Sequence, residues 1–279
     1  MSAPADDSNL AVFCDFENVA LGVREAKYPS FDIKNVLGRL LLKGSIVVRK
    51  AYCDWDRYKE FKAAMHEAAF ELIEIPHVRQ SGKNSADIRM VVDALDLCYT
   101  KPHVDTFVII SGDSDFSPLV AKLRENNKIV IGVGVKNSTS DLLTSACDEF
   151  IYYDDLVRAQ AQKRTRSAPR PARADAKAGA QPAAAPAPKS GEDERKQEAI
   201  DLVMETLEAL QEERGDQERI WGAQVGQALK RRHPGFRESY HGFRSFAALL
   251  EEAQRRGLMK LARDERSGGY VIQLQPSRD

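Results

Sequence analysis

Two stretches decide how this chain is expected to fold: LAVFCDFEN at residues 10–18 and TFVIISGDSDF at residues 106–116. Each opens with a short run of apolar, largely β-branched or aromatic residues, and aspartate follows soon after that run ends. Runs of this kind are typical of strands buried on both faces of a parallel sheet. Residues that directly follow such strands lie at the carboxyl edge of the sheet, where open α/β folds bind their ligands.

More apolar runs of the same kind occur before residue 157, with helix-period segments between them. The expected strands are SIVVRKAYC, ELIEI, KIVIGVG and EFIYY, at 45–53, 71–75, 128–134 and 149–153. The expected helices are IKNVLGRLLLK, DRYKEFKAAMHEAAF, ADIRMVVDALDLCY and FSPLVAKLREN, in which apolar residues recur three and four positions apart. Strands that alternate with helices predict an α/β fold with a parallel, helix-covered sheet.

Composition divides the chain into three parts. Residues 1–157 hold the alternating pattern, whereas residues 158–192 are rich in Ala, Pro and Arg and have almost no large apolar side chains. Such a segment cannot build a core, so a disordered linker is expected there. Residues 193–279 contain helical segments followed by two short strands around a turn at 268–269, which predicts a small winged-helix domain.

The net charge of −1 conceals an uneven distribution. Residues 1–157 carry 18 basic and 24 acidic side chains, residues 158–192 carry 8 and 2, and residues 193–279 carry 15 and 16. An acidic first domain does not attract nucleic acid by its overall charge, so binding there must come from local sites or neighbouring segments. The basic linker is therefore either a loose RNA contact or a plain tether.

Several classes of protein are disfavoured by the sequence. The N-terminal residues MSAPADDSNL have no basic start and no apolar run, and no stretch approaches the roughly 18 to 20 apolar residues of a membrane helix, so a cytoplasmic protein is expected. The four cysteines have no CxxC spacing, which argues against a zinc site and a disulfide framework. A P-loop motif is missing, and GVGVKN lacks the third glycine of a dinucleotide site.

Aspartates stand where the sheet edge is expected. Asp15 directly follows the first strand, Asp113 and Asp115 follow the strand at 106–111, and Asp87 begins a helix after the polar loop QSGKNS. Carboxylates that converge on one point repel each other unless a cation is present, and oxygen ligands suit Mg²⁺ or Mn²⁺. These four aspartates are the predicted metal ligands and catalytic residues. The simpler interpretation is that each one caps a helix or a turn.

Other side chains are expected to support this site. Asn18 is placed to hydrogen-bond a metal-bound water or a scissile phosphate oxygen, and Ser111 is expected to fix Asp113 or Asp115. Arg79 and Lys83, in the loop before Asp87, are candidates for gripping flanking phosphates, with idle solvated charges as the alternative. Asp93 and Asp96, further along the same helix, are weaker candidates for the site.

The motifs VFCDFEN, GKNSADIRMVVDAL and IISGDSDFSPL, in this order and spacing, resemble the NYN domain family, relatives of PIN and flap nucleases, over residues 8–155. The resemblance implies a compact PIN-like fold and Mg²⁺- or Mn²⁺-dependent cleavage of RNA. It also implies that the acidic and polar site consists of Asp15, Asn18, Asp87, Asp113 and Asp115. Some active relatives have paired acids where this chain has Ala86-Asp87. The alternatives are therefore a catalytically weak or inactive NYN scaffold that binds RNA or protein and, more distantly, a phosphatase.

The C-terminal part resembles the OST-HTH/LOTUS family over residues 194–275, through WGAQVGQALKRRHPGF, FRSFAALLEEA, GLMKL and GYVIQL. The resemblance implies RNA binding or docking of a protein partner, without catalysis. Most of the aromatic residues at 236–246 are expected in the core, with one or two rings left to stack on unpaired bases. The expected RNA contacts are basic residues of the second helix and the segment after it: Lys230, Arg231, Arg232, Arg237 and Arg244.

Overall fold

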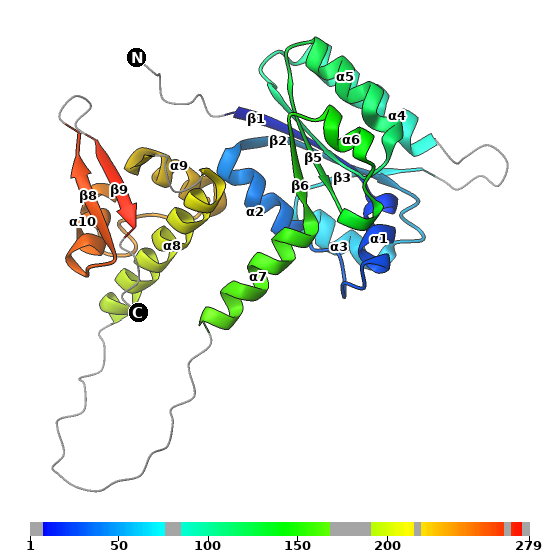
Figure 1. The fold of residues 1–279 in the computed structure, drawn as a ribbon. Coiled ribbons are helices and arrows are strands. Elements are labelled where there is room, and N and C mark those ends of the chain that lie inside the picture. The colour runs from blue at the N-terminus through cyan, green and yellow to red at the C-terminus, as the bar shows by residue number, and fades with distance from the viewer. Residues whose placement is uncertain (1–7, 76–84, 168–190, 215–218, 265–268, 275–279) are drawn as a thin grey trace, which may run out of the picture. The chain divides into compact units, whose positions relative to one another are not determined.

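The computed structural model describes residues 8–75, 85–167, 191–214, 219–264 and 269–274 of the 279-residue chain. The chain divides into two compact units, Met1–Ala168 and Pro169–Asp279. Figure 1 shows the helices and strands of both units. Among the described residues, no helix is both long enough and apolar enough to cross a membrane.

The first unit is built on a six-stranded parallel sheet with the order β3-β2-β1-β4-β5-β6. Its strands are β1 (Ser8–Asp15), β2 (Gly44–Cys53), β3 (Glu71–Glu74), β4 (Thr106–Ile110), β5 (Ile129–Gly134) and β6 (Glu149–Tyr152). The chain builds outward from β1, returns to the centre, and then builds outward from β4 in the other direction. The strand order therefore reverses between β1 and β4, and this is the topological switch point of the sheet.

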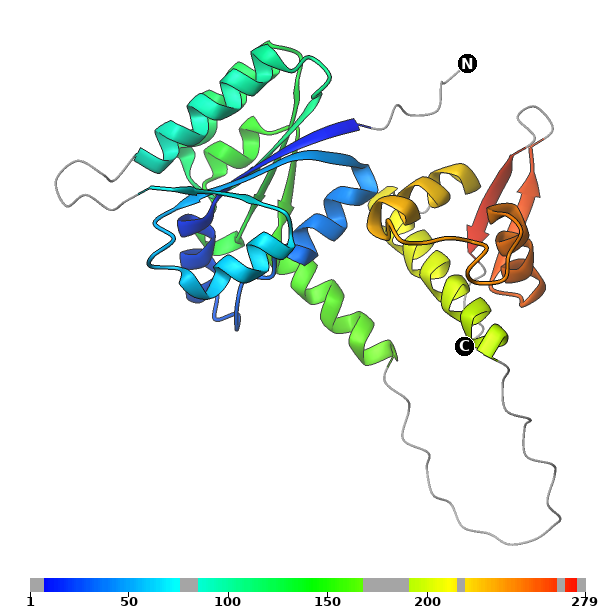
Figure 2. The same cartoon turned by 180° about the vertical axis from the view of Figure 1, so that it is seen from behind.

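Helices cover both faces of this sheet (Figures 1 and 2). One face is covered by α1 (Phe16–Glu25), α2 (Ile33–Lys43), α3 (Lys59–Glu67) and the start of α7 (Tyr153–Ser167), and the other by α4 (Ser85–Thr100), α5 (Ser117–Glu125) and α6 (Asp141–Ala146). Along β1, Leu10, Val12 and Cys14 belong to the first core, and Ala11 and Phe13 belong to the second. The central strand is thus buried on both faces, and the predicted α/β fold is confirmed.

The boundaries of the predicted linker need correction. Helix α7 continues past Val157 to Ser167, and α8 (Gly191–Arg214) already begins inside the segment 158–192. The reason is that Leu156 and Val157 anchor α7 against the core, and the following Arg, Ala, Gln and Lys residues are good helix formers. The remainder of the predicted linker, 168–190, lies outside the described residues.

The second unit contains three helices and a small antiparallel sheet. After α8 come β7 (Ile220–Trp221), α9 (Gly222–Arg232), α10 (Phe246–Arg255), β8 (Met259–Arg263) and β9 (Tyr270–Leu274), with the strand order β7-β9-β8. The helices and the two-stranded hairpin lie where the sequence pattern predicts them. Strand β7 is an addition, in which Ile220 and Trp221 pair with the middle strand of the sheet.

Candidate active site at the sheet switch point

Asp15 occupies the point where β1 ends and α1 begins. It is buried, with 7% of its surface exposed, and it caps the helix: its Oδ1 accepts a hydrogen bond from the backbone N–H of Asn18 at 3.4 Å. The expected capping role is therefore real. Capping leaves further lone pairs on the carboxylate, which has about four acceptor positions in all.

Ser111, the first residue after β4, connects the ends of the two central strands. Its hydroxyl is fully buried, donates to Oδ2 of Asp15 at 2.9 Å, and accepts from the backbone N–H of Asp113 at 3.2 Å. The expectation that Ser111 fixes Asp113 or Asp115 is met at the backbone of Asp113, and Ser111 also binds the side chain of Asp15, which was not expected. Because Cys14 and Ile110 are partners in the β1–β4 register, the residues that follow them meet each other.

Asn18 and Gly112 hold the loop after β4 against α1. The side-chain Oδ1 of Asn18 accepts a hydrogen bond from the backbone N–H of Gly112 at 2.9 Å. A Cβ atom on Gly112 would lie 2.2 Å from the carbonyl oxygen of Ser138, so a larger residue would displace this loop. Since the amide oxygen of Asn18 is engaged, the group that remains to meet a phosphate oxygen is its NH₂.

Asp113 and Asp115 follow on the same loop. Asp113 is half-buried and caps the short 3₁₀ turn Ser114–Phe116, accepting from the backbone N–H of Asp115 at 2.9 Å. Asp115 is exposed. Asp87 lies in the first turn of α4 and is half-buried. The predicted acids therefore come from three places in the fold: the end of β1, the loop after β4 and the start of α4.

The electrostatics show that these acids share one region. The pKa of Asp15 is raised from 3.8 to about 7, first because burial removes water from its carboxylate and then because of the negative charge of Asp87, with Asp113 adding a smaller effect. Burial also raises the pKa of Asp87 to about 6, followed by the charges of Asp113 and Asp115. Hydrogen bonds from Ser111 and Asn18 oppose the rise at Asp15 without cancelling it. At neutral pH these carboxylates destabilise one another.

Glu17 is an acid of this site that the sequence reasoning missed. Its negative charge also raises the pKa of Asp87, although its side chain is 40% exposed. The available signal was its position in the first turn of a helix that starts immediately after Asp15. Its Oε1 lies 3.5 Å from Nη1 of Arg57, at the start of the α3 region.

The residues present fit a hard divalent cation in chemistry, because their donors are all oxygens. Among the described residues, no three His, Cys, Asp or Glu side chains are gathered closely enough to hold an ion as they stand. Mg²⁺ usually keeps several waters and binds proteins through only one or two carboxylates. Asp15, Asp87 and Asp113 are therefore suited to hold such an ion partly through its water shell.

Among the other candidates in the first unit, Asp93 does not join the site. Arg79 and Lys83 lie in 76–84, outside the described residues. Asp93 points into an internal network, with its carboxylate 3.2 Å from Nζ of Lys50, 3.0 Å from Nε of Arg89 and 2.9 Å from the hydroxyl of Tyr52.

In the second unit, the predicted basic residues differ in accessibility. Lys230, Arg237 and Arg244 are exposed, and Arg231 is half-buried. Arg232 is not available as an RNA contact: its side chain is only 16% exposed and lies 2.8 Å from a carboxylate oxygen of Glu205 on α8. This ion pair fixes α9 against α8, because it joins residues 27 positions apart.

The aromatic residues of this unit divide as the sequence predicts. Phe236 and Phe243 are buried, while Tyr240 is 62% exposed. The guanidinium of Arg195 lies over the ring of Tyr240, with its Cζ 5.2 Å from the ring centroid. Tyr240 is therefore a largely exposed ring with a positive charge over one face, close in sequence to the exposed Arg237.

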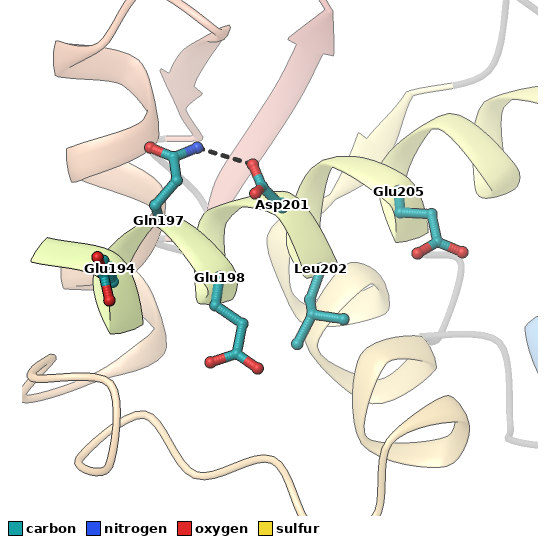
Figure 3. Close-up of a pocket in the computed structure, with 6 residues that line it drawn as sticks. All are labelled: Glu194, Gln197, Glu198, Asp201, Leu202 and Glu205. Atoms are coloured by element: carbon teal, nitrogen blue, oxygen red, sulfur yellow. Dashed lines mark hydrogen bonds between the residues drawn. The ribbon is translucent and has the colours of Figure 1, made fainter. Parts of the chain in front are cut away.

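Helix α8 has an acidic face that contrasts with this basic segment. A hollow of about 370 Å³ runs along the helix (Figure 3). It is lined by Glu194, Gln197, Glu198, Asp201, Leu202 and Glu205. Because its charges repel phosphates, RNA contacts in this unit are expected on α9 and the segment after it.

The fold and the acidic switch point define the first unit as a nuclease-like α/β domain. The NYN domain model matches residues 9–154, which is more than half of the chain. The chain therefore belongs to the NYN domain family, whose domains are generally PIN-like nucleases, and this places it among hydrolases at a coarse level.

Two relatives illustrate this similarity. An uncharacterised protein of Methanocaldococcus jannaschii is 29% identical over 120 residues, or 43% of this chain and 47% of that protein. The chain thus spans about half the length of this curated relative. A protein of unknown function from Vibrio parahaemolyticus, known from a crystal structure, is 28% identical in sequence. The match covers 56% of this chain and 98% of that protein's chain, with a TM-score of 0.49.

Proposed function

We propose that the protein is a ribonuclease that hydrolyses RNA phosphodiester bonds with Mg²⁺ or Mn²⁺ as its cofactor. The observation that carries this proposal is the clustering of acids at the switch point of the sheet, where burial and neighbouring carboxylates raise the pKa values of Asp15 and Asp87. Acids kept close together at a cost in stability are typical of functional sites. A divalent cation removes this cost, and a phosphodiester is the substrate class of the PIN-like nucleases.

Each residue has a distinct proposed role. Asp15, Asp87 and Asp113 hold the ion, and Asp115 accepts from its water shell at the exposed rim. When bound, the ion supplies positive charge at the scissile phosphate and lowers the pKa of a water molecule. Ser111 orients the carboxylate of Asp15 through its 2.9 Å hydrogen bond. The NH₂ group of Asn18 donates to a phosphate oxygen.

We further propose that the second unit is an OST-HTH/LOTUS-like winged-helix domain that brings RNA to the nuclease. The exposed Lys230, Arg237 and Arg244, the half-buried Arg231, and the open ring of Tyr240 support RNA binding. Basic side chains hold phosphates, and an exposed ring stacks on an unpaired base. Docking of a protein partner through this unit is the alternative that the resemblance leaves open.

The direct test is cleavage of end-labelled single-stranded RNA by the full chain. Activity should require Mg²⁺ or Mn²⁺, stop on addition of EDTA, and be poorly supported by Zn²⁺, which prefers nitrogen and sulfur ligands. Undiminished cleavage in chelator contradicts the proposed mechanism. RNA binding without cleavage, at any of these ions, favours the inactive scaffold, and turnover of a chromogenic phosphomonoester favours the phosphatase.

A further inference from the structure

A second cavity lies in the first unit, close to the acidic site. Its volume is about 360 Å³, within the range of roughly 300 to 1,000 Å³ typical of small-molecule sites. It is bounded by α1, by the segment that leads to α2, and by the start of α3. We call it the flanking cavity; its principal lining residues are Arg24, Tyr28, Phe31, Arg57, Tyr58 and Phe61.

The aromatic wall of the flanking cavity is attached to the active site through Phe16. This fully buried residue directly follows Asp15, and its ring centroid lies 5.6 Å from that of Tyr58, 5.1 Å from that of Phe61 and 6.0 Å from that of Phe31. Packing of this kind fixes the cavity relative to the carboxylate of Asp15, because both depend on the same turn between β1 and α1.

The ring of Tyr28, also on the wall of the flanking cavity, is held by residues that do not line the cavity. The hydroxyl of Tyr28 donates to Oδ1 of Asp154 at 2.9 Å, and the ring of Tyr28 lies 6.0 Å from that of Tyr153 in an edge-to-face arrangement. The ring is therefore kept in place without a ligand. A preformed aromatic wall of this kind stacks on a nucleobase at a small entropic cost.

The flanking cavity has two arginines, Arg24 and Arg57, and one acid, Glu60, on its lining, so basic side chains outnumber acidic ones there, unlike in the domain around it. The side chains of Arg24 and Arg57 are exposed. The pKa of Tyr58 is raised by burial and then by the negative charge of Glu17, and the positive charges of both arginines oppose this rise. Residues 1–157 are acidic as a whole, with 18 basic and 24 acidic side chains. Two arginines on one cavity are thus the kind of local exception that an acidic domain needs in order to bind a phosphate backbone.

The cavity lies beside the site of cleavage and does not coincide with it. Arg57 contacts Glu17, whose charge reaches Asp87. At about 1.5 Å of rise per residue, Arg24 lies ~9 Å further along α1 than Asn18. A group bound there belongs to a neighbouring nucleotide of the strand and not to the scissile phosphate.

We propose that the flanking cavity binds one nucleotide of a single-stranded RNA next to the bond that is cut. The base stacks on the aromatic wall, and its phosphate meets Arg24 and Arg57, since guanidinium groups match phosphate oxygens in charge and geometry. The inference rests on the proposed ribonuclease function. It implies a preference for unpaired RNA, because a base inside a helix cannot enter a cavity.

The first test needs no catalysis. Binding of uridine and adenosine 5′-monophosphate to the full chain is measured in EDTA by calorimetry, for the parent protein, for Arg24→Ala and for Arg57→Ala. The matched control is Lys101→Ala, which removes one exposed positive charge after α4, on the other face of the sheet. Each arginine variant should bind the nucleotide about tenfold more weakly, and the control should match the parent.

The second test maps the site on the parent protein. A short single-stranded RNA that contains 4-thiouridine beside the cleaved bond is photocrosslinked to the full chain, and the products are mapped by mass spectrometry. Crosslinks at Tyr58, Phe61 or Tyr28 support the cavity. Crosslinks confined to other elements, or equal losses of binding in Arg24→Ala and Lys101→Ala, overturn it. If nucleotide binds as expected but no RNA is cleaved, the ribonuclease proposal fails while the nucleotide site stands.

Discussion

Asp87 and Asp93 stand on the same helix, α4, yet their pKa values are shifted in opposite directions. The pKa of Asp87 is raised to about 6 by burial and by the charges of Asp113 and Asp115. At Asp93, burial also acts to raise the pKa, but hydrogen bonds from Tyr52 and Lys50 outweigh it and lower the value. The negative charge of Asp93 is balanced by hydrogen-bond donors inside the protein. Asp87 faces other acids and gains from an added cation.

This comparison separates an acid with positively charged partners inside the protein from an acid that faces other acids. The sequence already favours Asp87 over Asp93 as a site residue, because Asp87 lies at the start of the helix. The side chain of Asp93 is 12% exposed and has positive charges 3.0 and 3.2 Å away. The decisive property is thus the sign of the neighbouring charge, which depends on how the elements pack.

The largest expected effect is on catalysis. Asp15→Asn and Asp113→Asn keep the shape of the side chains but remove the charge that holds the ion, so each should lower kcat by about a hundredfold or more. Asp93→Asn is the matched control and should cleave at a rate close to that of the parent. Rates of RNA cleavage at saturating substrate decide the matter, and parental rates in Asp15→Asn and Asp113→Asn would place the active site elsewhere.

A second prediction concerns how the two units divide catalysis and RNA binding between them. Because α7 ends at Ser167, the appropriate truncated protein is residues 1–168. Loss of the second unit, with its exposed Lys230, Arg237 and Arg244, should raise KM for RNA about tenfold or more and reduce its salt dependence, while kcat changes little. Both constants are measured at two salt concentrations. An unchanged KM would show that the second unit serves another partner, and a collapsed kcat would show that it completes the active site.

A smaller loss is expected at Ser111, which touches Asp15 but not the proposed substrate. Ser111→Ala removes the 2.9 Å hydrogen bond that orients the carboxylate, and kcat should fall about tenfold, the usual scale for partners of metal ligands. The activity should depend more steeply on Mn²⁺ concentration than in the parent. Ser145→Ala, on the exposed side of α6, is the control and should leave both properties unchanged.

A further expected effect concerns stability against pH. In the folded protein the pKa of Asp15 is about 7, above its ordinary value of 3.8. The unfolded chain therefore ionises first, so Asp15 lowers the free energy of unfolding as pH rises from about 4 to about 7, by at most ~4 kcal/mol without metal. Asp15→Asn should become more stable relative to the parent over this range.

Asp93 should behave in the opposite sense, because its folded pKa is lowered. Its stabilising contribution is present above the pKa of the unfolded chain and is lost as pH falls through the lower folded value. Urea denaturation of the parent, Asp15→Asn and Asp93→Asn in EDTA at pH 3, pH 4.5 and pH 8 tests both signs, with the Asp93 effect expected between pH 4.5 and pH 3 and the Asp15 effect between pH 4.5 and pH 8. Stability differences that do not change with pH would contradict the electrostatic description of both acids.

Much of the fold could be predicted from local patterns, because the spacing of apolar residues indicates buried strands and amphipathic helices. The strands of the large sheet and helices α2 to α5 lie where those patterns place them. Helix α1 (FENVALGVRE) is not among the predicted helices, although the motif VFCDFEN includes its first three residues. The two-residue strand β7 is too short to have a period of its own.

For the candidate site, the sequence predicts which residues follow the strands but not the contacts between them. Placing Asp15 and Asp113 at one edge follows from the order of the elements. The contact between Ser111 and Asp15 joins residues 96 positions apart and depends on the register of β1 against β4, which no local pattern contains. The flanking cavity likewise arises where α1 and the start of α3 pack around Phe16.

The central claim is that the acids at the switch point form one divalent-cation site. The most direct measurement is anomalous diffraction from crystals of the full chain soaked in Mn²⁺, with Asp15→Asn crystals treated in the same way. The claim predicts a manganese peak between the carboxylates of Asp15, Asp87 and Asp113 in the parent and its loss or weakening in the variant. A parent crystal with no peak there, or with manganese bound at Asp93 instead, would contradict it.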